Sequence, residues 1–158
     1  MPPLILPEKL ELYGTTQENL AKLYGVFRHD LIDQRVQFQG LPVVLDNRIR
    51  DNREEGFWHL ITRQDQPVGR RDIDYKRAKR LPWIRPLIEG HPHPDILAWE
   101  ADEPNGKGKV VHKHYFWYDQ GKYLIVLWKQ PGNYFLATAF YVNEGHDRIR
   151  YREKYQRA

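Results

Sequence analysis

The chain has 158 residues and a formal net charge of +4, with 41% hydrophobic and 29% charged residues. This composition excludes a disordered chain and fits one globular domain, because enough apolar side chains are present to form a core. The apolar runs are too short to span a bilayer, so we expect no membrane association, and the absence of cysteine excludes disulfides and thiolate metal sites.

The first 14 residues form a proline-punctuated arm that we expect to lie irregularly on the surface. The arm lacks a basic n-region, so we expect no signal peptide. The initial methionine and the size of the chain lead us to expect a free-standing protein that acts in the cytoplasm. A helix is predicted over residues 15–34, because Thr15 and Glu18 fit a capping box and an apolar stripe follows at helical spacing. The stripe consists of Leu20, Leu23, Tyr24, Phe27 and Leu31.

Residues 35–45 predict a short hairpin, in which two apolar runs are interrupted by a glycine and a proline. Residues 46–55 predict a charged loop. Phe57–Arg63 predict a short strand, and His59 and Arg63 share one of its faces because side chains alternate. A titratable ring near a permanent cation suits phosphate chemistry, although an isolated histidine on a strand is more often a packing or surface residue.

The densest basic cluster follows at residues 73–80, which we expect to form a helix capped by Asp72. Its members are Lys76, Arg77, Lys79 and Arg80. Residues 63–85 together carry eight basic and three acidic side chains, a net charge of +5. Such a surface suits a polyanion such as RNA or an acidic protein, and it is equally typical of a solvated helix face. Pro82 predicts the start of a second short helix, which residues 90–94 end.

The final third predicts strand after strand, over residues 96–101, 109–118, 123–129 and 134–142. Short turns between these strands predict an antiparallel meander. The fold class is therefore α+β, with an N-terminal helix and a helical insertion packed on a four- to five-stranded antiparallel sheet. We expect a single domain over residues 1–158, with a core at residues 35–142 and a charged tail at residues 143–158 that ends in a helix.

Two histidine pairs are candidates for metal binding. His91 and His93 lie in a proline turn, which is a weak signal, and His112 and His114 share a strand face at i, i+2. The sequence shows no carboxylate or third histidine that clearly joins His112 and His114. We therefore predict no metal and no cofactor, and we interpret these two residues as exposed strand residues or RNA contacts.

Strong catalytic signatures are absent, since the chain has no GxSxG, no Walker loop and no HExxH. The chain offers His59, many arginines and lysines, and hydroxyls on the last predicted strand. This set suits metal-independent RNA cleavage, in which the 2′-hydroxyl attacks the adjacent phosphate while a base and an acid move protons and cations hold the extra charge. Histidine titrates near neutrality, and arginine binds phosphate through two parallel contacts.

Three segments occur in a characteristic order: Phe57–Arg63 with H-L-I-T, Arg77–Ile84 with basic residues before W-I, and Leu136–Tyr141 with T-A-F-Y. This ordered set resembles the phage and toxin nucleases of the barnase–EndoU–colicin–RelE (BECR) fold, over roughly residues 35–142. The resemblance implies a helical N-terminal part on an antiparallel sheet that carries the site. It also implies an RNA substrate and often a cognate antitoxin or immunity protein, which we expect to be acidic.

By this resemblance, the catalytic residues are His59, Arg63, Thr138 and Tyr141. Thr138 and Tyr141 are three residues apart, so a regular strand places them on opposite faces; either a bulge brings both to the site or only one of them serves. Phe140 shares the face of Thr138 and is suited to stack on a base. The predicted RNA contacts are Lys76, Arg77, Lys79, Arg80, Lys129 and Phe140.

We therefore interpret the chain as a metal-independent endoribonuclease, either a toxin or a nuclease of a phage or mobile element. One alternative is a non-catalytic RNA-binding module, because five Trp, ten Tyr and six Phe are interleaved with basic residues. The other is a protein-interaction domain whose basic face meets an acidic protein. RNA cleavage in EDTA separates the first interpretation from the others, and salt-sensitive RNA binding separates the two alternatives.

Overall fold

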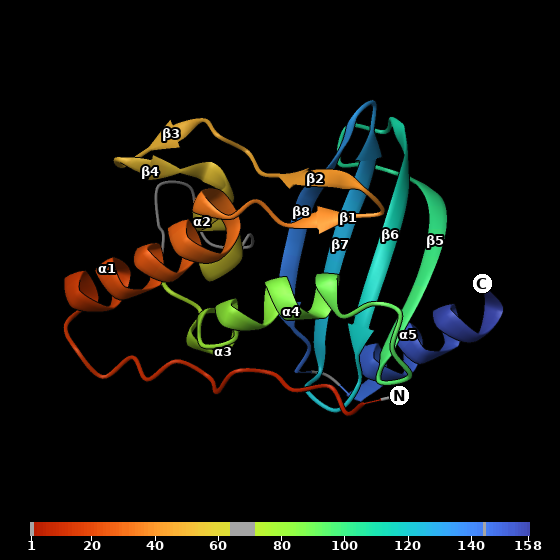
Figure 1. Cartoon of the computed structure of the whole chain (residues 1–158), viewed down its shortest axis with the longest axis horizontal. Coiled ribbons are helices and arrows are strands. Elements are labelled where there is room, and N and C mark those ends of the chain that lie inside the picture. Colours follow the sequence, from red (N-terminus) through yellow and green to blue (C-terminus); the bar gives the residue numbers. More distant parts are fainter. Residues whose placement is uncertain (1, 64–71, 144) are drawn as a thin grey trace.

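A computed structural model of the chain describes residues 2–63, 72–143 and 145–158 (Figure 1). Its helices are α1 (Thr16–Phe27), α2 (Glu55–Ile61), α3 (Tyr75–Ala78), α4 (Ile84–Glu89) and α5 (Gly145–Arg157), with a π-helical turn at Arg28–Asp33 and a 3-10 turn at Leu81–Trp83. Its strands are β1 (Gln37–Phe38), β2 (Leu41–Val44), β3 (Ile49–Arg50), β4 (Arg53–Glu54), β5 (Ile96–Pro104), β6 (Val110–Tyr118), β7 (Tyr123–Gln130) and β8 (Asn133–Tyr141). The fold is mixed α+β, as predicted from the sequence.

The main sheet has six strands in the order β1-β2-β8-β7-β6-β5, and β3 and β4 pair separately. The predicted meander of β5 to β8 is confirmed, because each of these strands pairs antiparallel with the next. The predicted antiparallel sheet of four or five strands agrees only roughly with the structure, since the sheet has six strands and β2 adds to β8 in parallel. Parallel neighbours need a long crossover, and the chain between β2 and β8 provides one that includes α2, α3 and α4.

The first helix follows its sequence signals closely. The Thr15 side chain accepts a hydrogen bond from the Glu18 N–H, and the Glu18 carboxylate accepts one from the Thr15 N–H, so the predicted capping box is present. The predicted apolar stripe faces inward, and Leu23 and Phe27 are fully buried. The helix ends as the π-helical turn at Arg28–Asp33, close to the predicted end at residue 34.

The segment that carries His59 is a helix rather than the predicted strand. Phe57, Leu60 and Ile61 are fully buried on one side of α2, at the i, i+3, i+4 spacing of a helix. The aromatic and β-branched residues of this segment also favour a strand, so local propensity and helical spacing conflict and packing decides. Because α2 ends at Ile61, His59 and Arg63 do not share a strand face as predicted.

The elements that flank α2 also differ from the sequence predictions. Residues 46–55 contain the small hairpin of β3 and β4 rather than a loop alone, and its turn residues Asp51 and Asn52 both have positive φ, as this tight turn type requires. The basic helix α3 is shorter than predicted. Its cap is Asp74, whose carboxylate accepts a hydrogen bond from the Arg77 N–H, rather than Asp72.

The sheet is buried on both faces over much of its length. On β7, Ile125 and Leu127 belong to the core shared with α1, α2 and α4, whereas Leu124 and Val126 belong to a second core on the opposite face. This arrangement explains why the strand reads as a continuous apolar run rather than an alternating one. Figure 1 shows α1 and α2 beside β8 and α5 on the other side of the sheet.

The second face of the sheet packs against α5. With helices on one face only, this second face would be open to a ligand. Tyr151 of α5 is buried against Trp117, with ring centroids 5.4 Å apart. At the β6–β7 turn, the Asp119 carboxylate accepts hydrogen bonds from both Arg148 and Arg152 of α5 and from the Trp117 indole N–H. Among the described residues, no helix has the length and apolar character needed to cross a membrane.

We expect Asp119→Ala to loosen α5, because it removes the carboxylate that holds two arginines of the helix. The Arg152 and Arg148 guanidinium groups and the Trp117 N–H hold the pKa of Asp119 below its usual range, against the opposing effect of burial. The expected loss of about 1–2 kcal/mol is therefore constant above the unfolded-state pKa of about 3.9 and disappears as the pH falls through the lower folded-state value.

Chemical denaturation of both proteins across this pH range measures the difference. Trypsin cleavage within α5 at neutral pH should also be faster in the variant. Equal cleavage rates and equal unfolding free energies at neutral pH would contradict this role of Asp119.

Candidate functional site

Basic side chains of α3 and of the turn that follows it lie around the aromatic end of β8. The Lys76 Nζ lies 5.7 Å and the Arg80 Cζ 4.1 Å from the centroid of the Tyr141 ring, and the Arg77 Cζ lies 5.6 Å from the centroid of Phe140. These distances are within the range of cation–π contacts. We call these five residues the cationic–aromatic site; all five are among the residues predicted from the sequence.

Arg77 connects this site to the helix of His59. Its Nη1 donates hydrogen bonds to the carbonyl oxygens of His59, at 3.1 Å, and of Thr62, at 2.6 Å, at the C-terminal end of α2. A guanidinium at this position compensates the negative end of the helix dipole as well as pairing its last carbonyls. Its side chain is only 11% exposed, so Arg77 holds α2, α3 and β8 together rather than extending into solvent.

The side chain of His59 is 30% exposed and lies on the outer side of α2. Its Nε2 is 3.8 Å from Oε2 of Glu55, one helical turn earlier, and its charge also acts on Asp46. Asp46 in turn holds Arg48 through a hydrogen bond of 2.9 Å. The imidazole is thus an accessible titratable group with carboxylates near it. Arg63 is exposed and follows the end of α2 by two residues.

The structure places Thr138 on the opposite face of the sheet from Tyr141. The register of β7 and β8 shifts between Val126 and Leu127, and this bulge makes Ala137 the extra residue. The bulge precedes Thr138, so Thr138 and Tyr141 stay on opposite faces of the sheet. Thr138 and Phe140 line a pocket beneath Tyr151 of α5, whereas Tyr141 packs with the larger core next to α3. The expectation that His59 and Thr138 lie on one sheet surface is wrong, because His59 is on the helix α2.

Two other predicted RNA contacts also lie outside the cationic–aromatic site. Lys129 is near the opposite end of the sheet, where its Nζ donates to the carbonyl of Gln130 and lies 5.4 Å from the Tyr134 ring centroid. Lys79 directly follows α3 and lines a shallow pocket together with Trp83 and the N-terminal arm. Lys79 thus extends the basic surface of α3, whereas Lys129 does not.

A second cluster of functional groups lies on the β5–β6 hairpin. Glu100 pairs in register with His114, and Asp102 pairs with His112, so alternation places all four side chains on one face. The Glu100 Oε1 is 2.7 Å from the His112 Nε2 and 3.2 Å from the His114 Nε2, and the Asp102 Oδ1 is 2.8 Å from the His112 Nδ1. The inference that no carboxylate joins the two histidines is therefore wrong.

The charge state of this cluster follows from its hydrogen bonds and burial. Hydrogen bonds to Glu100 and Asp102 raise the pKa of His112, and the hydrogen bond to His112 lowers the pKa of Glu100. Burial lowers the pKa of His114, which packs against the rings of Phe38 and Tyr134. The spacing Glu-x-Asp on one strand and His-x-His on the next, with a short turn between, is the sequence signal from which this cluster could have been found.

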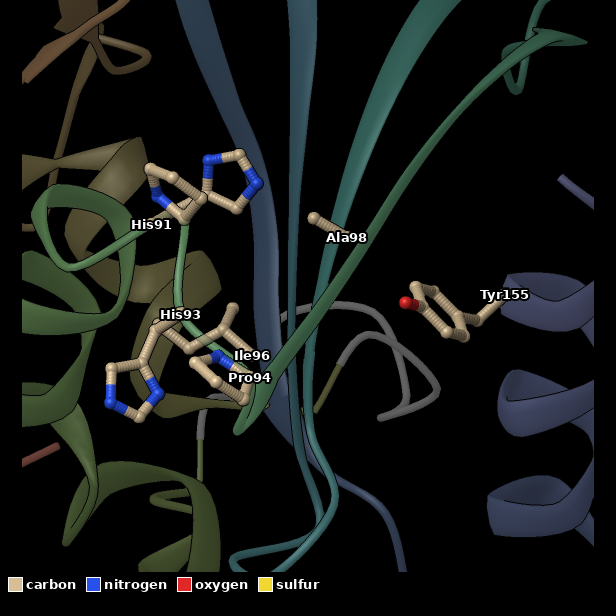
Figure 2. Close-up of a pocket in the computed structure, with 7 residues that line it drawn as sticks. His91, His93, Pro94, Ile96, Ala98 and Tyr155 are labelled. Carbon is tan, nitrogen blue, oxygen red and sulfur yellow. The ribbon is translucent and has the colours of Figure 1, made fainter. Parts of the chain in front are cut away.

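The other predicted histidine pair has a structural role at His93. The Asp95 N–H donates to the His93 Nδ1 at 3.0 Å, which makes Nε2 the protonated nitrogen, and Nε2 lies 2.9 Å from the carbonyl oxygen of Pro2. Both ring nitrogens of His93 are thus used, so the ring pins the N-terminal arm. Figure 2 shows His91 and His93 on the loop before β5, with Tyr155 of α5 facing Ala98 across the adjoining pocket.

Comparisons with known proteins returned no match to a family model, to a curated protein or to a solved structure. The chain is an α+β protein with a mixed, curled sheet that carries two clusters of polar side chains.

Proposed function

We propose that this protein is a metal-independent endoribonuclease whose active site is formed by α2, α3 and the end of β8. The observation that carries the proposal is the position of Arg77, which joins the last turn of α2 to the aromatic end of β8. An accessible histidine, a cationic patch and aromatic rings are thereby fixed on neighbouring elements. The resemblance of these segments to BECR nucleases points to the same chemistry.

Each part of the site has a role in RNA cleavage. His59 acts as the general base or acid for the 2′-hydroxyl and the leaving oxygen, because its ring is partly exposed and imidazole is the side-chain group best suited to proton transfer at neutral pH. Lys76 and Arg63 hold the phosphate, whose negative charge increases in the transition state. Arg80 stays cationic although burial lowers the pKa of its guanidinium. Tyr141 provides an aromatic surface, and the assignment of Thr138 to the site is withdrawn.

The test is incubation of the protein with RNA and with DNA of the same sequence in EDTA. We expect RNA products that end in a 2′,3′-cyclic phosphate, and we expect DNA to bind and stay intact because it has no 2′-hydroxyl. DNA cleavage, or a requirement for added metal, would refute the mechanism. Salt-sensitive RNA binding without cleavage would favour the non-catalytic RNA-binding module instead.

We expect the double variant Lys76→Ala, Lys79→Ala to show a weaker salt dependence of RNA binding. Each phosphate contact contributes about −0.7 to the slope of log affinity against log salt for a single strand, so the slope should become flatter by up to about 1.4. Lys107→Ala, Lys109→Ala is a matched control, because it removes the same charge from the β5–β6 turn. Equal slopes for the two double variants would show that Lys76 and Lys79 are solvent-exposed side chains that do not contact RNA phosphates.

The same surface suggests how the activity is restrained. A free ribonuclease acting in the cytoplasm would damage the cell that makes it, and the resemblance implies an antitoxin or immunity protein as partner. A positively charged surface attracts an acidic protein by the same long-range electrostatics that attract RNA. An inhibitor of this kind would compete with RNA for Lys76 and its neighbours.

A further inference from the structure

The β5–β6 hairpin presents a cluster that RNA cleavage by His59 does not use. Its carboxylate and two imidazoles come from adjacent strands, with Glu100 directly opposite His114. The turn between the strands is held by its own hydrogen bonds, including Asn105 N–H to the Lys109 carbonyl at 2.7 Å and Lys109 N–H to the Asn105 side chain at 3.0 Å. The cluster is therefore supported by a regular and well-paired part of the sheet.

We propose that Glu100, His112 and His114 bind a divalent transition-metal ion, with Asp102 orienting His112. One donor atom from each of the three ligands lies within 4.8 Å of the other two. Ligands at about 2.0–2.2 Å from a zinc ion in tetrahedral geometry lie roughly 3.3–3.6 Å apart. The Glu100–His114 separation of 3.2 Å and the Glu100–His112 separation of 2.7 Å need only small side-chain rotations to reach this spacing.

The groups around the ligands have the arrangement that metal sites use. A histidine ligand usually donates its second ring N–H to a carboxylate, which fixes the ring and increases its basicity. Asp102 Oδ1 stands 2.8 Å from the His112 Nδ1 and leaves Nε2 directed at Glu100. His114 is 7% exposed, and the rings of Phe38 and Tyr134, at 5.3 and 5.2 Å, limit its movement.

The donor set indicates the class of metal and the kind of site. Two imidazoles and one carboxylate suit zinc and the other late first-row ions, whereas calcium and magnesium prefer all-oxygen sites. Glu100 is largely exposed and His112 partly exposed, so further coordination positions face solvent. Three protein ligands with an open position are typical of metal sites that bind water or a substrate, rather than of closed structural sites.

This site is separate from the proposed ribonuclease site. His112 and His114 lie in the first half of β6, whereas Tyr141 is the last residue of β8, which runs in the same direction as β6. The two sites therefore lie toward opposite ends of the sheet. RNA cleavage in EDTA by the His112→Ala variant should equal that of the unmodified protein, so failure of either proposal can be recognised without the other.

The test is calorimetric titration of ZnCl₂ into the full chain, prepared without a histidine tag and freed of metal by a chelator. We expect one zinc per chain. Asp102→Asn should weaken binding by about 10–100-fold, and His112→Ala or Glu100→Gln should weaken it further because each removes a ligand. The absorption bands of bound Co²⁺ should change in Asp102→Asn, which a purely structural role would not cause.

His29→Ala is the matched control, because this histidine is 73% exposed and lies at the end of α1, hydrogen bonded to Asp30. It should bind zinc as the unmodified protein does. His114 is buried, so its replacement by alanine could unfold the protein, and far-UV circular dichroism is used to check the fold of His114→Ala. If that variant does not fold, the variants of Glu100 and His112, which are more exposed, decide the result. Absence of zinc binding, or binding that His112→Ala and Glu100→Gln leave unchanged, would overturn the proposal.

Discussion

Replacing His59 with alanine should reduce RNA cleavage in EDTA by about 10²–10⁴-fold, the usual value of acid–base assistance by one positioned group. RNA affinity should change little, because Lys76 and Arg80 remain in place. Thermal stability should also be nearly unchanged, since the His59 side chain is partly exposed and its ring is not part of the core. Single-turnover cleavage with saturating protein separates the loss of chemistry from any loss of binding.

His29→Ala again provides the control, as a partly comparable surface histidine that the mechanism does not use. It should cleave RNA at the rate of the unmodified protein. If His59→Ala retains full activity, the general acid or base is another group and the active site proposed for α2, α3 and β8 is wrong. If cleavage and affinity fall together, His59 contributes to binding rather than to proton transfer.

The sequence predicted the second half of the fold well, because its signals there are local. Turn residues such as Gly132, whose φ is 79°, separate the strands. Each of these strands pairs in the sheet with the strand that follows it in the sequence. The capping box of α1 is likewise a signal contained within four residues. In these parts, propensity, spacing and tertiary packing agree.

The sequence failed where distant segments decide the structure. The pairing of β2 with β8 joins residues about 90 positions apart, and no local pattern indicates it. The helix α2 is fixed by burial of Phe57 against Tyr24 and Phe27, with ring centroids 5.2 and 5.3 Å apart, and its residues alone also favour a strand. The error placed His59 on the face of a strand, whereas it lies on a helix.

The cationic–aromatic site and the cluster at Glu100 also differ in how far local sequence signals predict them. The cationic–aromatic site could be predicted as a set of residues, because basic and aromatic residues crowd into two short segments, but its geometry depends on Arg77 reaching across to α2. The cluster at Glu100 needed the register of a hairpin, which fixes which residues of β5 and β6 face one another. Residue types alone therefore indicated His112 and His114 but left out the carboxylates that complete the cluster.

Replacing Arg77 with alanine should have the largest effect on stability and activity together. Its guanidinium donates to the carbonyls of His59 and Thr62, and without it these groups at the end of α2 lose a charged partner. Hydrogen bonds to charged groups are worth about 1.5–3 kcal/mol each, so we expect a loss of about 2–4 kcal/mol after relaxation. For a chain of this size, that corresponds to a fall in Tm of roughly 5–15 °C.

RNA cleavage, measured well below the Tm of the variant, should also fall, because α2 is no longer fixed relative to Phe140 at the end of β8. Arg77→Lys tests this reason directly: it keeps the charge but not the planar donor group, so its Tm and its cleavage rate should lie between those of Arg77→Ala and the unmodified protein. Arg157→Ala removes an arginine that is 79% exposed and should change neither quantity. An unchanged Tm in Arg77→Ala would mean that packing alone holds α2 in place. The contacts of Arg77 would then no longer support the proposed active site.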